Sequence, residues 1–120
     1  MNPNDYQMKA HEFADYSQPV ILDKEKNVIS SVNYIYPVMG LTEEAGEVAG
    51  KFAKAVRDCN GKIDETRKIE IIKELGDVMW FVAEIATVLN VPLEEVMQKN
   101  ISKLTSRLER GIIHGSGDNR

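Results

Sequence analysis

Residues 64–89, DETRKIEIIKELGDVMWFVAEIATVL, carry the strongest structural pattern in the chain. Apolar side chains recur there every three or four residues, which is the period of one helical face. Asp64 suits an N-cap, Glu65 places an acid in the first turn, and Asn90 can end the helix. The apolar stripe consists of Ile69, Ile72, Leu75, Val78, Met79, Val82, Ile85, Ala86 and Leu89. This stretch therefore predicts a long amphipathic helix with one buried face.

Three further segments have helical patterns, namely residues 4–16, 37–58 and 92–110. Pro3, Pro37 and Pro92 suit helix starts, and Asn60-Gly61 is a strong stop signal. Short links between the last three helices favour antiparallel neighbours. We therefore expect an all-α antiparallel bundle of about four helices, in a single domain over residues 1–120 whose residues 111–120 form an irregular, flexible tail.

Residues 17–33 do not fit a helix. They contain Pro19 and two short apolar runs on either side of a polar stretch at residues 23–27. This pattern suits either a small hairpin or an ordered loop. Because an isolated two-stranded hairpin is only marginally stable, we expect an irregular loop between the first two helices.

The composition is that of an ordinary globular domain, with 42% apolar and 28% charged residues among 120. The net charge of −4 disfavours a nucleic acid as partner, because that partner needs a basic face. No run approaches the roughly 18 apolar residues of a membrane span. Cys59 is the only cysteine, and residues 1–6 lack the pattern of a signal peptide. We therefore expect a cytoplasmic protein without a nucleic-acid or membrane partner.

Two pairs of acids, Glu44 with Glu47 and Glu74 with Asp77, lie three residues apart on predicted helices. This spacing places both members of a pair on the same face. If the pairs face each other, one carboxylate contact at about 4 Å costs on the order of 4 kcal/mol at an effective dielectric near 20. A divalent cation would offset this repulsion, and carboxylate oxygens select Mg²⁺, Mn²⁺ or Ca²⁺. The pattern therefore favours a metal site over a solvated acidic face.

Two further features support a site with hard oxygen ligands. Gly46 and Gly76 lie inside the acid motifs, where each costs roughly 1 kcal/mol relative to alanine. Such glycines make sense where two helix backbones approach closely or where a ligand needs room. The histidines, His11 and His114, are far from both motifs, which disfavours zinc and the Glu-x-x-His di-iron ligand set.

These residues resemble the MazG-like family of nucleoside triphosphate pyrophosphohydrolases, an all-α superfamily marked by E-x-x-E on one helix and E-x-x-D on the next. The matching elements are Glu44-Ala45-Gly46-Glu47 and Glu74-Leu75-Gly76-Asp77. Downstream, the stretch from Asn100 to Leu104 resembles the family's N-x-x-K-L element. Residues 115–120, GSGDNR, resemble the ending of small MazG-like proteins.

The resemblance implies hydrolysis of an NTP or dNTP between its α and β phosphates, with release of the monophosphate and pyrophosphate. Removal of non-canonical nucleotides is one role of this reaction. The acids Glu44, Glu47, Glu74 and Asp77 would hold Mg²⁺, or Mn²⁺. Glu43 or Glu47 would act catalytically, by orienting the attacking water or taking its proton.

The resemblance also implies substrate-binding residues outside the acid motifs. Lys103 would contact a phosphate, and Asn100 a phosphate, the sugar or the base. Trp80 is a candidate to stack on the base, with a place in the core or a dimer interface as the alternative, and Arg120 could close over the phosphates. The family's dimers and tetramers imply a homodimer or homotetramer. Oligomerisation would also add the buried surface that a small chain with inward-facing acids lacks.

Two other interpretations stay open. The chain could be a non-catalytic helical interaction or regulatory protein whose acidic face binds a basic partner. It could also be a phosphoribosyl-ATP pyrophosphohydrolase, or a dUTPase or dCTPase-like relative. These enzymes share the metal chemistry and differ in the base pocket, which the sequence does not identify.

Overall fold

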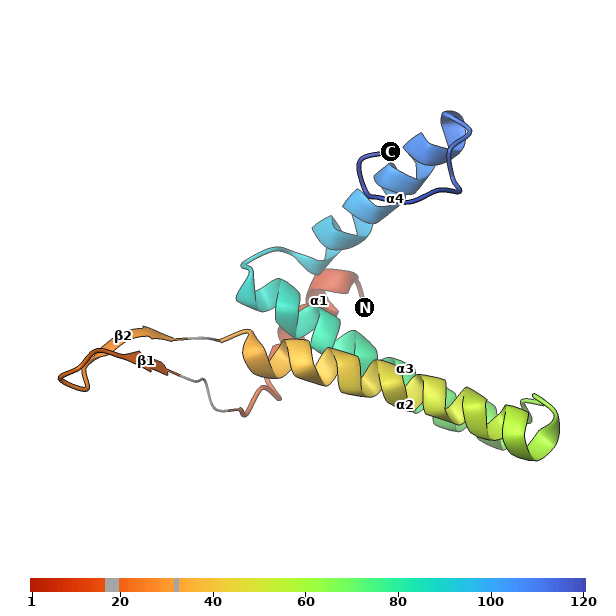
Figure 1. The fold of residues 1–120 in the computed structure, drawn as a ribbon, viewed down its shortest axis with the longest axis horizontal. Coiled ribbons are helices and arrows are strands. Elements are labelled where there is room, and N and C mark those ends of the chain that lie inside the picture. Colours follow the sequence, from red (N-terminus) through yellow and green to blue (C-terminus); the bar gives the residue numbers. More distant parts are fainter. Residues whose placement is uncertain (17–19, 32) are drawn as a thin grey trace.

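The computed structural model describes residues 1–16, 20–31 and 33–120 (Figure 1). The helices in this part of the chain are α1 (Pro3–His11), α2 (Ile35–Cys59), α3 (Glu65–Val88) and α4 (Leu93–Glu109). Strands β1 (Val20–Leu22) and β2 (Val28–Ser31) lie between α1 and α2. The all-α prediction is confirmed, although α1 ends at His11, earlier than the expected residue 16.

Local signals set the ends of the two long helices as expected. The Asp64 side chain accepts a hydrogen bond from the Arg67 backbone amide at 2.9 Å, so Asp64 is the N-cap of α3. Asn60 adopts the left-handed conformation with φ of 52° at the end of α2, and Gly61 follows with φ of 79°. The five residues between α2 and α3 thus form a tight connection that returns the chain antiparallel to α2 (Figure 1).

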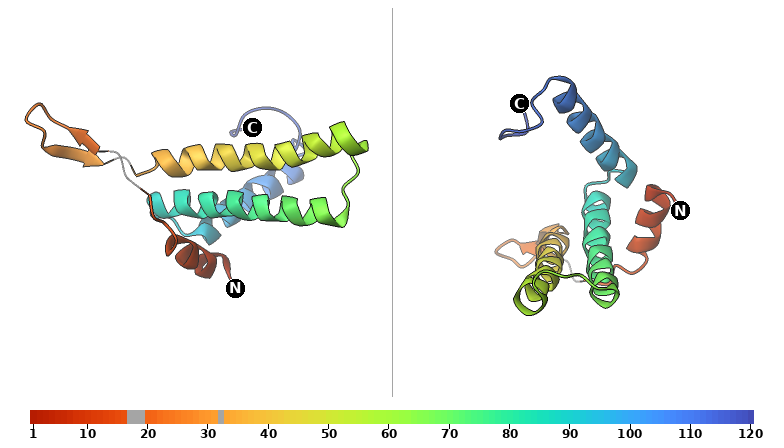
Figure 2. Two further views of the ribbon diagram at one scale, coloured as in Figure 1. Left: turned by 90° about the horizontal axis from the view of Figure 1, so that it is seen from below. Right: turned by 90° about the vertical axis from the view of Figure 1, so that its right-hand side faces the viewer.

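The segment between α1 and α2 forms an antiparallel hairpin, so the expectation of an irregular loop is wrong. Val20 pairs with Ser31 and Ile21 with Ser30, and the register then shifts. A hydrogen bond within the turn stabilises it, since the Asp23 carboxylate accepts from the Asn27 backbone amide at 2.8 Å. The hairpin extends beyond the end of the α2–α3 pair (Figure 2). Pro19 lies outside the described residues.

Helix α3 is the centre of the arrangement, with α2 along one side and α1 on another (Figure 2). Helix α4 does not return along α3 as the short link suggested. The chain instead turns by 102° between α3 and α4, so α4 points away from the α2–α3 pair. In the described part of the chain no single helix has the length and apolar composition of a membrane span; α3 and α4 meet that test only when they are joined.

The close approach of α2 and α3 occurs at Gly40. A Cβ atom there would overlap the Phe81 ring of α3, so any larger residue would require the ring or the helices to move. Close approach of another helix at Gly46 and Gly76, one of the two explanations that the sequence suggested, is wrong. Among the described residues, no atom beyond the chain neighbours of each glycine and the nearby backbone of its own helix lies within 4 Å of a Cβ built there. Space for a ligand remains as the explanation for these two glycines.

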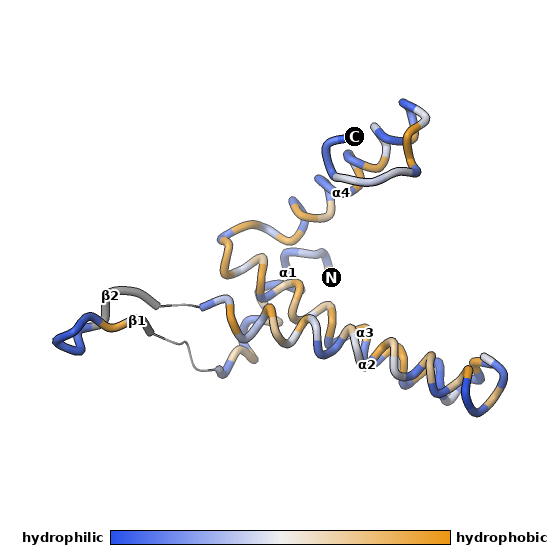
Figure 3. The backbone as a smooth tube through the Cα atoms, viewed as in Figure 1, coloured by the Kyte–Doolittle hydropathy of each residue, from blue (hydrophilic) through white to orange (hydrophobic). Residues whose placement is uncertain are grey.

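The buried core is small for a chain of this length. Among the described residues, the buried apolar side chains are Ala10, Ala55, Ile71, Phe81, Ala83, Ala86 and Leu93. Apolar residues lie along the whole length of α2, α3 and α4 (Figure 3), and many are exposed, such as Met39, Ile72 and Ile101. The radius of gyration is 18.6 Å, whereas a compact domain of this length has about 14 Å. The single chain is therefore elongated and leaves much apolar surface in contact with solvent.

Candidate metal centre

The antiparallel pairing of α2 and α3 brings three of the predicted acids together. Glu44 on α2 faces Glu74 and Asp77 on α3, and one carboxylate oxygen from each lies within 4.8 Å of the other two. We call these three residues the acid cluster. Glu74 and Asp77 share a face because they are three residues apart on α3, as the sequence predicted.

Burial and repulsion make the acid cluster electrostatically unfavourable. The pKa of Glu44 is raised, first by burial and then by the negative charge of Asp77, with smaller contributions from Glu43, Glu74 and Glu47. Lys51 offsets part of the charge, since its Nζ lies 3.3 Å from a Glu74 oxygen. In the part of the chain that the structure describes, neither Glu44 nor Asp77 forms an ion pair with a cationic side chain. The repulsion at these two carboxylates is thus left for another cation to neutralise.

The donor set fits a hard divalent ion. All three ligands are carboxylates, the groups that Mg²⁺, Mn²⁺ and Ca²⁺ prefer. Oxygens that bind one Mg²⁺ at about 2.1 Å can lie up to about 4.2 Å apart, so a spacing within 4.8 Å requires only a small side-chain adjustment. Asp77 is exposed, whereas Glu44 and Glu74 are partly buried. The cluster is therefore open to solvent on the side of Asp77, where a substrate could approach.

Glu43 and Glu47 lie on the same helix as Glu44, but neither belongs to the acid cluster found among the described residues. Both side chains are exposed, and both contribute negative potential at Glu44. Tyr6 of α1 was not predicted. Its pKa is raised first by burial and then by the negative charge of Asp77.

Trp80 packs between α3 and α1. Its indole Nε1 donates a hydrogen bond to the Ala10 carbonyl at 2.9 Å, and its ring meets Phe81 edge to face at 4.8 Å between centroids. It also packs against the buried cluster of Ala10, Ala83 and Leu93. The structure thus gives Trp80 a role in packing α1, and a stacking contact with a base stays a prediction.

The predicted phosphate-binding residues do not join the acid cluster within one chain. Asn100 and Lys103 lie on α4, which points away from the α2–α3 pair (Figure 1). Lys103 Nζ instead lies 3.4 Å from an Asp118 oxygen in the tail. The Arg120 guanidinium donates hydrogen bonds to the tail carbonyls of Gly117 and Ile113. The tail thus folds back against α4.

A second polar cluster was missed by the sequence reasoning, which left His11 without a partner. Glu84 is fully buried on α3, and both of its carboxylate oxygens lie 3.2 Å from His11 Nδ1. The Tyr16 hydroxyl donates to the same carboxylate at 3.2 Å. The one available signal was an acid flanked by Ala83 and Ile85 in the apolar half of the helix. Its partners are about 70 residues away in sequence, so no local pattern links them.

Comparison with known proteins identifies the family. The model of the MazG nucleotide pyrophosphohydrolase domain matches residues 37–111, which include both acid motifs. The gene 37 protein of Mycobacterium phage L5 is 43% identical over 120 residues, which cover the whole of both chains. The uncharacterized protein YvdC of Bacillus subtilis (strain 168) is 39% identical over 75 residues, or 58% of this chain and 70% of YvdC. No solved structure matches significantly. The chain belongs to the MazG nucleotide pyrophosphohydrolase family.

Proposed function

We propose that this protein is a Mg²⁺-dependent nucleoside triphosphate pyrophosphohydrolase. It would cleave an NTP or dNTP between the α and β phosphates and release the monophosphate and pyrophosphate. The observation that carries the proposal is the acid cluster, because three carboxylates converge within 4.8 Å at the motifs of this family. Mn²⁺ could replace Mg²⁺, since both prefer oxygen ligands.

Each acid of the two motifs can be assigned a role in such a reaction. Glu44, Glu74 and Asp77 would hold the ion, with Glu47 able to join them from the next turn of α2. The ion would supply Lewis-acid chemistry, namely neutralisation of phosphate charge and a water of lowered pKa. Glu43 and Glu47 are exposed carboxylates beside the cluster, so either could orient the attacking water and accept its proton.

A second copy of the chain would complete the site. Asn100 and Lys103 belong to α4, which points away from the α2–α3 pair that carries the acid cluster, and much of the apolar surface of α2, α3 and α4 is exposed. A homodimer or homotetramer could bury this surface and bring α4 of one copy toward the acids of another. This arrangement would place the phosphate-binding residues and the metal ligands in one pocket.

The test is a panel of nucleoside triphosphates incubated with Mg²⁺, with the products separated by ion-exchange chromatography. The panel should include dUTP, dCTP and phosphoribosyl-ATP, so that the related activities are distinguished. We expect monophosphate and pyrophosphate in equal amounts for at least one substrate. Diphosphate with inorganic phosphate, or no product across the panel, would contradict the proposal.

Two pairs of variants make the test specific. Glu74→Gln and Asp77→Asn remove one charge each from the acid cluster, and we expect at least about a hundredfold loss of turnover if they hold the ion. Glu65→Gln is the control for the first, because Glu65 is an exposed acid in the first turn of α3 and pairs with Lys68 instead of with the cluster. Asp58→Asn is the control for the second, because Asp58 pairs with Arg57 away from the cluster. Both controls should keep wild-type turnover.

A further inference from the structure

Helix α4 carries a cationic pair that includes a residue which the sequence reasoning missed. Lys103 and Arg107 lie four residues apart, one turn along the same helical face, and Asn100 precedes them on that face. The Arg107 side chain is only 7% exposed, although α4 is mostly exposed on its other positions. Arginine is rarely buried without a charged partner. The buried Arg107 therefore requires an anionic partner, which the tail supplies in the free chain.

The carboxylate of Asp118 is this partner. One of its oxygens lies 3.3 Å from Arg107 Nη2 and 3.4 Å from Lys103 Nζ, between the two cations. Arg107 Nη2 also donates to the backbone carbonyls of Gly117 and Asp118, at 3.2 and 3.0 Å. Among the described residues, Arg107 Nε is buried and has no hydrogen-bond partner. The carboxylate thus uses only part of the guanidinium fork.

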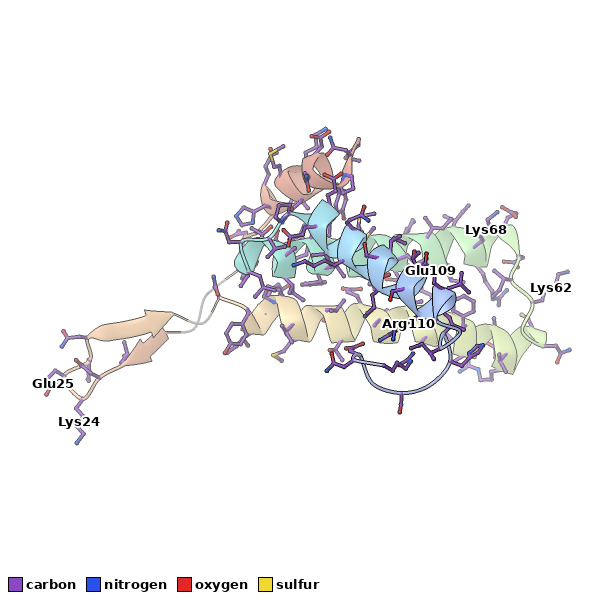
Figure 4. All side chains as sticks on the ribbon, turned by 90° about the horizontal axis from the view of Figure 1, so that it is seen from above. Lys24, Glu25, Lys62, Lys68, Glu109 and Arg110 are labelled. Carbon is purple, nitrogen blue, oxygen red and sulfur yellow. The ribbon has the colours of Figure 1, made fainter. Side chains whose placement is uncertain are left out.

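The tail that carries Asp118 is held mainly by polar contacts. Figure 4 shows Arg110 at the C-terminal end of α4 beside the loop of the tail, and Arg110 Nη2 donates to the Arg120 carbonyl at 2.9 Å. Gly115 and Gly117 have φ of 136° and 83°, which lets the chain turn back along the helix. Asp118 itself is 83% exposed. A ligand that competes for the cations could therefore displace the tail without opening an apolar core.

We propose that Lys103 and Arg107 form a polyphosphate-binding site and that Asp118 occupies it in the free chain as an internal competitor. Binding of a polyphosphate chain then releases residues 111–120. The proposal rests on the proposed function in that the natural ligand is the triphosphate of the nucleotide. A phosphate group has more oxygens and more charge than one carboxylate, and it can engage both arms of the Arg107 fork. The ion pairs of Asp118 are at 3.3 and 3.4 Å, longer than the 2.7–2.9 Å that charge-assisted bonds favour.

The experiment uses the full chain in metal-free buffer, so that no turnover is needed. Inorganic tripolyphosphate is titrated by calorimetry, and hydrogen–deuterium exchange of residues 111–120 is followed by mass spectrometry. We expect tripolyphosphate to bind the wild type and to raise exchange in the tail. Asp118→Asn should bind about three- to tenfold more tightly, because a surface ion pair of this kind contributes little and competes directly. Its tail should exchange somewhat faster than that of the wild type in the absence of ligand, because only the carboxylate contacts are lost and the bonds to the tail carbonyls remain.

Two more variants make the result specific. Arg107→Lys keeps the positive charge but loses the planar fork, so it should bind tripolyphosphate more weakly than the wild type. Asp58→Asn is the matched control, because it also removes a carboxylate paired with arginine and changes the net charge equally. It should leave the affinity unchanged. Equal affinities of wild type and Asp118→Asn, or tail exchange that tripolyphosphate does not alter, would overturn the proposal.

Parallel hydrolysis assays separate this proposal from the proposed function. If nucleotides are hydrolysed but tripolyphosphate leaves the tail in place, the internal competitor is refuted and the pyrophosphohydrolase stands. If tripolyphosphate releases the tail but no nucleotide is hydrolysed, the α4 site is supported and the proposed function fails.

Discussion

At the scale of single residues, Glu44 has the least favourable surroundings in the acid cluster. Burial and the neighbouring acids raise its pKa. A raised pKa means that the folded chain binds the proton more tightly than the unfolded chain does. In metal-free buffer, stability from this group is therefore present below the ordinary carboxyl value and is lost as the pH rises through the raised pKa. At neutral pH, the ionised Glu44 destabilises the fold.

Replacement of Glu44 by glutamine tests whether the ionised Glu44 destabilises the fold. Because like charges at helical spacing cost roughly 0.2–0.5 kcal/mol per pair, metal-free Glu44→Gln should melt about 1–3 °C above the wild type at neutral pH. The gain should disappear below the ordinary glutamate pKa of 4.5. Differential scanning calorimetry over a pH series measures both effects, with Glu65→Gln as the control that should show no such gain. A lower melting temperature for Glu44→Gln at neutral pH would refute the assignment.

Some site residues could be predicted from the local sequence, and others could not. Glu74 and Asp77 share a helical turn, and the family motif links them to Glu44, so the acid cluster was predictable. Glu84 was not, because its partners His11 and Tyr16 belong to another part of the chain. A buried acid is recognised by its tertiary partners, which periodicity does not encode.

At the scale of elements, Gly40 of α2 packs tightly against the Phe81 side chain of α3. A side chain at Gly40 would collide with the Phe81 ring, and that ring contacts Tyr36, which stacks on Tyr16. Gly40→Ala should therefore separate the helices locally and cost about 1–3 kcal/mol in the free energy of unfolding. Urea denaturation measures this cost.

The other two helical glycines provide the controls. Among the described residues, nothing lies within 4 Å of a Cβ at Gly46 or Gly76. Gly46→Ala and Gly76→Ala should therefore leave the chain as stable as before, or stabilise it by up to about 1 kcal/mol through helix propensity. A stability loss in these variants as large as that of Gly40→Ala would show that the close approach has been misplaced.

The direction of α4 shows why helix positions were easier to predict than helix arrangement. Pro92, the N-cap of α4, makes no side-chain cap bond in the described structure, and α1 supplies the bonds instead. Gln7 Oε1 accepts from the Leu93 amide at 2.8 Å, and Asn4 Oδ1 accepts from the Glu94 amide at 3.1 Å. These bonds hold the start of α4 to α1 and fix the turn after α3. No pattern within residues 90–110 contains that information.

At the scale of the whole molecule, the accessible surface of the single chain is larger than that of a compact protein of the same mass. Its accessible surface is 8968 Å², whereas a compact monomer of 13.5 kDa has about 6,500 Å². The difference of about 2,400 Å² for one chain exceeds the roughly 800 Å² that each partner buries in a standard interface. We therefore expect a homodimer or homotetramer in solution.

Size-exclusion chromatography with light scattering measures the oligomeric state directly. The mass should be two or four times that of the chain, and the melting temperature should rise with protein concentration, since association stabilises the folded state. A strict monomer at micromolar concentration, with a melting temperature independent of concentration, would refute the shared site.

The central claim is that Glu44, Glu74 and Asp77 form a divalent metal site, and thermal unfolding with and without Mg²⁺ tests it most directly. An ion at 100 times its dissociation constant stabilises the folded state by about 2.7 kcal/mol, which corresponds to a shift of several degrees. Mg²⁺ or Mn²⁺ should therefore raise the melting temperature of the wild type and of Glu65→Gln, but not of Glu74→Gln or Asp77→Asn. A wild-type melting temperature that neither ion changes would contradict the claim.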